Sequence, residues 1–171
     1  MYKNESLVGE AIAECISEGV ITREEIFIFG SFRLTSKLHS NFHDPDLIIA
    51  VIKHQLNLLK LNYLDLYLIH APWGTVSTDN ASFSVDNIYE NGFPVIKDFD
   101  HMLIWRELEK AVDQGLVRRI GLSNFDELQV DKINSVFNLL YVFLYYVKDR
   151  VDSKSKSTCI LNDFYSTNCQ F

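Results

Sequence analysis

Residues 64–74, LDLYLIHAPWG, contain the stretch that decides the fold. The run LDLYLIH is short and mostly apolar, and Pro72 and Gly74 follow it. A continuous apolar run bounded by turn residues is typical of a strand that is buried on both faces of a parallel sheet. His70 ends this run, at the carboxyl edge where parallel sheets carry their functional groups.

Helix and strand patterns alternate on both sides of this run. Apolar periodicity, candidate N-caps and glycine stops predict four helices. The helices are expected over residues 5–18, 45–60, 101–114 and 126–134, with Asn4, Asp44 and Asp100 as caps of the first three. Strands are expected near 26–29, 63–69 and 118–122, and a polar loop over about 75–99.

This alternation favours right-handed βαβ units and a parallel sheet. A doubly wound sheet and part of a (β/α) barrel both have the pattern. No GxGxxG sequence follows a predicted strand, so the dinucleotide fingerprint of a doubly wound domain is missing. We therefore expect a partial (β/α)8 TIM barrel. Polar residues follow three strands, namely Lys37, His70, and Ser123 with Asn124, and they should meet at one edge of the sheet.

Composition narrows the class of protein. A chain of 171 residues with 47% hydrophobic residues can bury one sizeable core. The net charge is −7 and no basic cluster is long enough to follow a phosphate backbone, so nucleic acid is not expected as a partner. Three cysteines, Cys15, Cys159 and Cys169, lack the spacing of a zinc site, which predicts free thiols, no metal and a reducing compartment.

A membrane location is also not expected. The apolar stretch at 136–147 is about twelve residues long, whereas a membrane-spanning helix needs ~20. The N-terminus lacks the apolar core of a signal peptide. These observations predict a cytoplasmic protein.

Several motifs resemble those of the aldo-keto reductase family. They are MYKNESLVGEAI at the N-terminus, REEIFI followed by TSKL, LDLYLIHAP, and WRELEKAVDQGLVRRIGLSNF, and together they cover residues 2 to about 133. The resemblance implies a (β/α)8 barrel, NADPH as cofactor, and a small-molecule substrate, an aldehyde or ketone that is reduced to an alcohol.

The resemblance also implies roles for individual residues. Tyr2, Lys37 and His70 match catalytic positions of the family, and Ser123 and Asn124 match positions that bind the nicotinamide carboxamide. Carbonyl reduction needs an acid beside the oxygen that becomes anionic, and the resemblance gives this role to Tyr2. A phenol has a pKa of about 10, which the ammonium of Lys37 would lower, while His70 would orient the carbonyl.

The chain also departs from the family pattern. The family's catalytic aspartate lies about five residues before the tyrosine, and this chain begins one residue before Tyr2. FGSFRL, residues 29–34, separates REEIFI from TSKL, and His39 and Ala71 stand where many members have tryptophan. The resemblance ends after Ile133, so we expect a partial barrel over 1–135 and a divergent tail over 136–171, whose apolar part, 139–147, needs shelter from water.

Two functions follow from these observations. The first is an NADPH-dependent aldo-keto reductase whose activity is impaired because the chain is an incomplete fragment. The alternative is a non-catalytic partial barrel that acts, if at all, as an interaction protein and self-associates through exposed strand edges.

Overall fold

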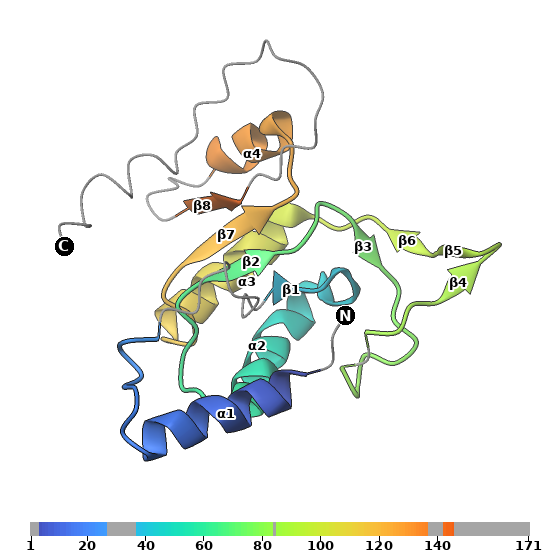
Figure 1. Ribbon diagram of the computed structural model, residues 1–171. Coiled ribbons are helices and arrows are strands. Elements are labelled where there is room, and N and C mark those ends of the chain that lie inside the picture. Colours follow the sequence, from blue (N-terminus) through green and yellow to red (C-terminus); the bar gives the residue numbers. More distant parts are fainter. Residues whose placement is uncertain (1–3, 27–36, 84, 137–141, 146–171) are drawn as a thin grey trace, which may run out of the picture.

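The computed structural model describes residues 4–26, 37–83, 85–136 and 142–145 (Figure 1). Four α-helices lie in these ranges: α1 (Glu5–Ser17), α2 (Pro45–Leu59), α3 (His101–Asp113) and α4 (Glu127–Asn134). A short 3-10 helix, η1, spans Ser40–Phe42. The strands are β1 (Lys37–Leu38), β2 (Tyr67–Ile69), β3 (Gly74–Thr75), β4 (Tyr89–Glu90), β5 (Phe93–Pro94), β6 (Ile96–Lys97), β7 (Ile120–Ser123) and β8 (Val142–Tyr145).

The main sheet has the strand order β1-β2-β7-β8, and every neighbouring pair is parallel. Each strand therefore lies beside the next strand of the sheet along the chain. A doubly wound sheet reverses its strand order at a switch point, and the described strands contain no such reversal. The order is that of an arc of a (β/α) barrel, as the sequence predicted.

The predicted helices agree with the structure to within about one residue. All three proposed caps occupy N-cap positions, and two of them make a side-chain hydrogen bond. Asp44 accepts a hydrogen bond from the amide of Asp46, and Asp100 accepts one from the amide of Met102. Asn4 occupies the N-cap of α1 as predicted, but its side chain makes no capping hydrogen bond. The predicted strands 63–69 and 118–122 correspond to β2 and β7, while most of the strand predicted at 26–29 lies outside the described residues.

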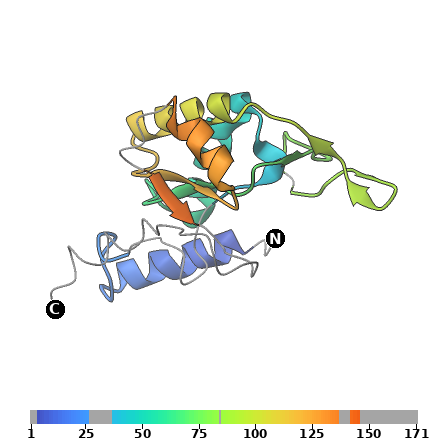
Figure 2. The ribbon, with the colours of Figure 1, turned by 90° about the horizontal axis from the view of Figure 1, so that it is seen from above.

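Helices α2 and α3 lie side by side along the sheet (Figures 1 and 2). The core between these layers is built mainly from Leu, Ile and Val, together with fully buried Trp105 and Tyr67. Helix α1 packs on α2 at Gly9, where a Cβ atom would meet the backbone of Leu58 and Leu59. Both helices can approach this closely because glycine has no side chain.

The prediction of a plain polar loop at 75–99 was wrong. The segment contains two short antiparallel ladders, β3 with β6 and β4 with β5. Asn91 and Gly92, both in the left-handed region with φ of 52° and 82°, join β4 to β5 in a tight hairpin. The hairpin extends away from the sheet in both views (Figures 1 and 2), and Tyr89, Phe93 and Ile96 are exposed. Strands of only two residues leave no alternating pattern in the sequence.

Part of the apolar stretch 139–147 forms β8, which continues the sheet beside β7. The boundary between a barrel at 1–135 and a tail from 136 stays a prediction. Among the described residues, no helix combines the length and hydropathy needed to cross a membrane.

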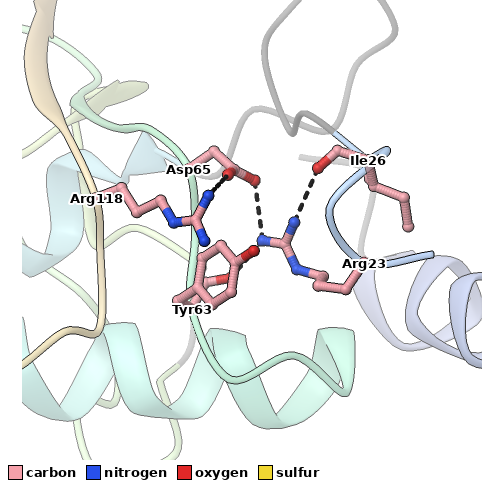
Figure 3. Close-up of polar contacts among 5 residues, drawn as sticks. All are labelled: Arg23, Ile26, Tyr63, Asp65 and Arg118. Carbon is pink, nitrogen blue, oxygen red and sulfur yellow. Dashed lines mark hydrogen bonds and ion pairs between the residues drawn. The ribbon is translucent and has the colours of Figure 1, made fainter.

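A charged cluster lies at the amino ends of the strands (Figure 3). Asp65, just before β2, contacts Arg23 at 2.9 Å and Arg118, just before β7, at 3.6 Å. Both guanidinium groups lie 3.9 Å from the centre of the Tyr63 ring, one on each face. Arg23 also donates to the carbonyl oxygens of Tyr63 and Ile26, so the cluster connects three successive βα units.

Candidate functional site

The candidate site lies at the opposite, carboxyl ends of the strands. Lys37 belongs to β1, His70 directly follows β2, and Ser123 is the last residue of β7. The ladder pairs Leu38 with Ile69 and Ile69 with Leu122, so His70 and Ser123 come one step later at the same edge. Parallel pairing alone therefore collects these polar residues at one edge.

Hydrogen bonds join these strand ends directly. The ammonium nitrogen of Lys37 donates to Ser123 Oγ at 3.3 Å. Asn124 Nδ2 donates to the backbone oxygen of His70 at 2.7 Å and to Ser123 Oγ at 3.1 Å. The backbone N–H of His70 in turn donates to the carbonyl of Leu38 at 3.1 Å. The structure thus brings Lys37, His70, Ser123 and Asn124 together.

Asn124 can make these contacts because of its backbone conformation. Its φ is 64°, in the left-handed region that asparagine tolerates better than most residues. This turn ends β7 and leads to α4, whose N-cap Asp126 forms a reciprocal capping box with Gln129. The left-handed turn therefore separates the strand from the helix and directs the amide of Asn124 back across the sheet.

His39 is a further polar residue at this edge. Its ring centroid lies 6.2 Å from that of His70, and its Nδ1 accepts a hydrogen bond from the amide of Asn41 at 3.3 Å. The sequence had marked His39 only as a departure from the family pattern. A signal was available, because residues 37 and 39 share one face of an extended strand.

Burial makes the basic groups of the site weaker bases than usual. Burial lowers the pKa of Lys37. Burial, followed by the charge of Lys37, lowers the pKa of His70. For His39, burial and then His70 lower the pKa to about 4. At neutral pH both imidazoles are therefore neutral, and a neutral imidazole can donate one hydrogen bond and accept another.

The hydrogen-bond directions define what the site offers to a ligand. The ammonium of Lys37 and the amide of Asn124 can only donate at Ser123 Oγ, so this hydroxyl must give its own hydrogen to a third group. Asn124 uses both amide hydrogens within the protein and keeps Oδ1 as an acceptor. One donor and one acceptor, on adjacent residues, match the oxygen and the NH2 of a primary carboxamide such as that of nicotinamide.

Tyr2, the predicted acid, lies outside the described residues, as does the FGSFRL segment. The position of Tyr2 relative to Lys37 and His70 therefore stays a prediction. Within the described ranges, no group of three or more His, Cys, Asp or Glu side chains could hold a metal ion. Cys15 is a free thiol.

The fold and the polar strand ends define the class of protein. It is a partial α/β barrel whose candidate site lies at the carboxyl edge of a parallel sheet. The model of the Aldo/keto reductase family matches residues 1–157. The chain belongs to this family.

Relatives and solved structures agree with that assignment. The chain is 39% identical over 141 residues to dihydrodiol dehydrogenase 3 of Bos taurus, covering 82% of this chain and 41% of the relative. It is 39% identical over 138 residues to aldo-keto reductase family 1 member A1 of Xenopus tropicalis, covering 80% and 39%. The structure of the aldose reductase from Schistosoma japonicum superposes with a TM-score of 0.72 at 34% identity, over 85% of this chain and 46% of that one. This chain thus spans less than half the length of these proteins.

Proposed function

We propose that the protein is an oxidoreductase that reduces aldehydes or ketones to alcohols with NADPH. The observation that carries the proposal is the arrangement of Ser123 and Asn124, which present one hydrogen-bond donor and one acceptor beside Lys37 and His70. The family membership and the names of the relatives support the same reaction class. A cytoplasmic location stays part of this proposal.

The residues would divide the reaction between them. A bound nicotinamide cofactor would supply the hydride. Ser123 and Asn124 would hold its carboxamide. Tyr2 would donate a proton to the carbonyl oxygen, and the ammonium of Lys37 would stabilise the phenolate that remains. His70, neutral at pH 7 because burial lowers its pKa, would donate a hydrogen bond to the same oxygen and so orient the substrate.

Cofactor binding is the direct test. NADPH is titrated into the purified 171-residue chain, and its fluorescence is followed, with NADH as the comparison. Asn124→Ala should weaken NADPH binding about two- to tenfold, because one hydrogen bond contributes roughly 0.5–1.5 kcal/mol net. Asn134→Ala removes an exposed asparagine at the end of α4 and should leave binding unchanged. Absence of NADPH binding, or equal losses in both variants, would contradict the proposal.

Turnover tests the catalytic roles. The absorbance of NADPH is followed with a simple aldehyde, in the wild type and in a His70→Ala variant. A drop in kcat of about a hundredfold or more is expected for His70→Ala, because the loss of one hydrogen-bond donor to an oxygen that becomes anionic costs about 10²–10³-fold. An unchanged kcat would remove His70 from the mechanism.

A second candidate function is self-association. Among the described strands, β1 and β8 each have only one neighbour in the sheet, and parallel edges can pair with another chain. In this candidate the partner is a second copy of the chain. Sedimentation over a range of concentrations tests it: a dimer or larger species supports the candidate, and a monomer at all concentrations refutes it.

A further inference from the structure

We propose that Ser123 is a positioning residue for Lys37, which holds the ammonium group and so connects the cofactor end of the site on β7 to the proton-transfer end on β1. The importance of this contact for catalysis rests on the proposed function. This role of Ser123 goes beyond contact with a carboxamide.

The geometry places Ser123 at a junction. Its side-chain oxygen accepts hydrogen bonds from Lys37 Nζ at 3.3 Å and from Asn124 Nδ2 at 3.1 Å, and the residue is only 1% exposed. Lys37 and Ser123 are 86 residues apart in the sequence, on strands that both flank β2. The contact therefore crosses the full width of the central strand.

Accepting a hydrogen bond from an ammonium group stabilises its charged form. Burial acts in the opposite direction and lowers the pKa of Lys37. The hydroxyl of Ser123 thus offsets part of the effect of burial and keeps Lys37 charged over a wider pH range.

The same hydroxyl couples Lys37 to a ligand. A hydroxyl that donates its hydrogen to a ligand becomes a better acceptor for its other partners. A carboxamide bound at Ser123 would therefore favour the protonated form of Lys37, and by reciprocity a protonated Lys37 would favour the carboxamide. Cofactor binding and the charge of the lysine would support each other.

Among the described residues around Lys37, the histidines do not change charge above pH 7. The phenol of Tyr2, which the proposed function places beside Lys37, titrates in this range and is common to the wild type and the Ser123 variants, so their comparison isolates Ser123. His39 lies two residues after Lys37, and His70 directly follows β2. Both histidines have lowered pKa values and stay neutral above pH 7. Helix α2 also packs on β1, but its Lys53 is exposed and its His54 is stacked on Phe83. The titration of Lys37 can therefore be followed above pH 7 without a change in the imidazoles.

The test measures the reactivity of the Lys37 amine without any cofactor. The full chain is acetylated with limiting acetic anhydride at pH values from 7 to about 11, and mass spectrometry compares Lys37 with exposed Lys53 as an internal reference. Only the uncharged amine reacts. Ser123→Ala should shift the Lys37 curve to lower pH, so that below its midpoint Lys37 reacts about three- to tenfold faster, with the same plateau at high pH.

Ser40→Ala is the matched control. Ser40 is a partly buried serine three residues after Lys37, and its hydroxyl pairs with Thr75 at 2.8 Å. This variant should leave the Lys37 curve in place. Ser123→Val replaces the hydroxyl by apolar atoms and adds no ionisable group. It should shift the curve in the same direction as alanine, including when the alanine variant fails to fold.

The outcomes separate the possible roles. An unshifted Lys37 curve in the folded Ser123 variants overturns the proposal. A uniform rise at all pH values reports access to the amine, with no change in its pKa, and also overturns it, as does an equal shift in Ser40→Ala. Because no cofactor is present, a shift specific to Ser123 stands even where NADPH fails to bind, so the two proposals fail independently.

Discussion

Replacing Asp65 by asparagine should destabilise the protein strongly, because it removes the only carboxylate of the charged cluster in Figure 3. The side chain of Asp65 is 3% exposed, and that of its partner Arg23 is 15% exposed. Removing one member of a buried ion pair costs about 3–5 kcal/mol, because the remaining charge stays in a poorly solvated place.

The structure places the expected loss at the lower end of that range. Arg23 keeps two carbonyl acceptors, from Tyr63 and Ile26, both at 2.8 Å. The ion pair between Arg118 and Asp65 adds little to this loss, because the Arg118 side chain is 55% exposed and the two charged groups are 3.6 Å apart. An exposed pair of this kind is worth about 0.2–1 kcal/mol. We therefore expect Asp65→Asn to lower the free energy of unfolding by about 3 kcal/mol.

Urea denaturation of the two single variants measures this difference. Arg118→Gln is the matched control and should cost no more than about 2 kcal/mol, because it removes an exposed ion pair and a cation–π contact with Tyr63, each worth up to about 1 kcal/mol. In 1 M NaCl the loss caused by Arg118→Gln should shrink, whereas the loss caused by Asp65→Asn should persist, because buried pairs are screened much less than exposed ones. A loss below 1 kcal/mol for Asp65→Asn, or equal losses for both variants, would refute the reasoning.

Three further predictions concern helix packing, pH and capping. Gly9→Ala should lower Tm by several degrees, since its Cβ would lie 2.7 Å from Leu59 Cα and overpacking costs about 1–3 kcal/mol; an unchanged Tm would contradict this contact. Burial lowers the pKa of His43 to about 4, so the unfolded chain binds more protons between pH 6.5 and 4 and stability should fall as pH drops through this window, by about 2 kcal/mol at pH 5. A His43→Phe variant should show a flatter pH dependence of unfolding, and an equally steep one would exclude this histidine as the cause. Asp126→Ala should cost about 1 kcal/mol in urea unfolding because the N-cap hydrogen bond to Gln129 is lost, whereas Asp131→Ala should cost less than half of that.

Much of the framework could be predicted from local chemistry. The helices were found because their caps and glycine stops act within a few residues, and Asp44 and Asp100 make the expected hydrogen bonds. The strand at LDLYLIH was found because burial on both faces requires a continuous apolar run. The strand predicted at 26–29 and the acid predicted at Tyr2 are not tested, since both lie largely or fully outside the described residues.

The local sequence also determined which residues could gather at one edge. His70 follows β2 and Ser123 ends β7, whereas Lys37, predicted to follow a strand, is the first residue of the two-residue strand β1. Parallel strands point their carboxyl ends in the same direction. Their convergence therefore required only that the strands pair in order, which β1, β2 and β7 do. The roles of these residues stay predictions.

Only the tertiary structure decided how these groups contact one another. The bond from Lys37 to Ser123 and the two bonds of the Asn124 amide depend on ladder register and on a single left-handed φ, neither of which leaves a periodic trace in the sequence. The charged cluster also depends on tertiary structure, because Arg23, Asp65 and Arg118 come from separate parts of the chain and meet only where three βα units begin. A sequence determines elements through short-range preferences, but contacts between side chains from distant strands exist only once packing has brought those strands together.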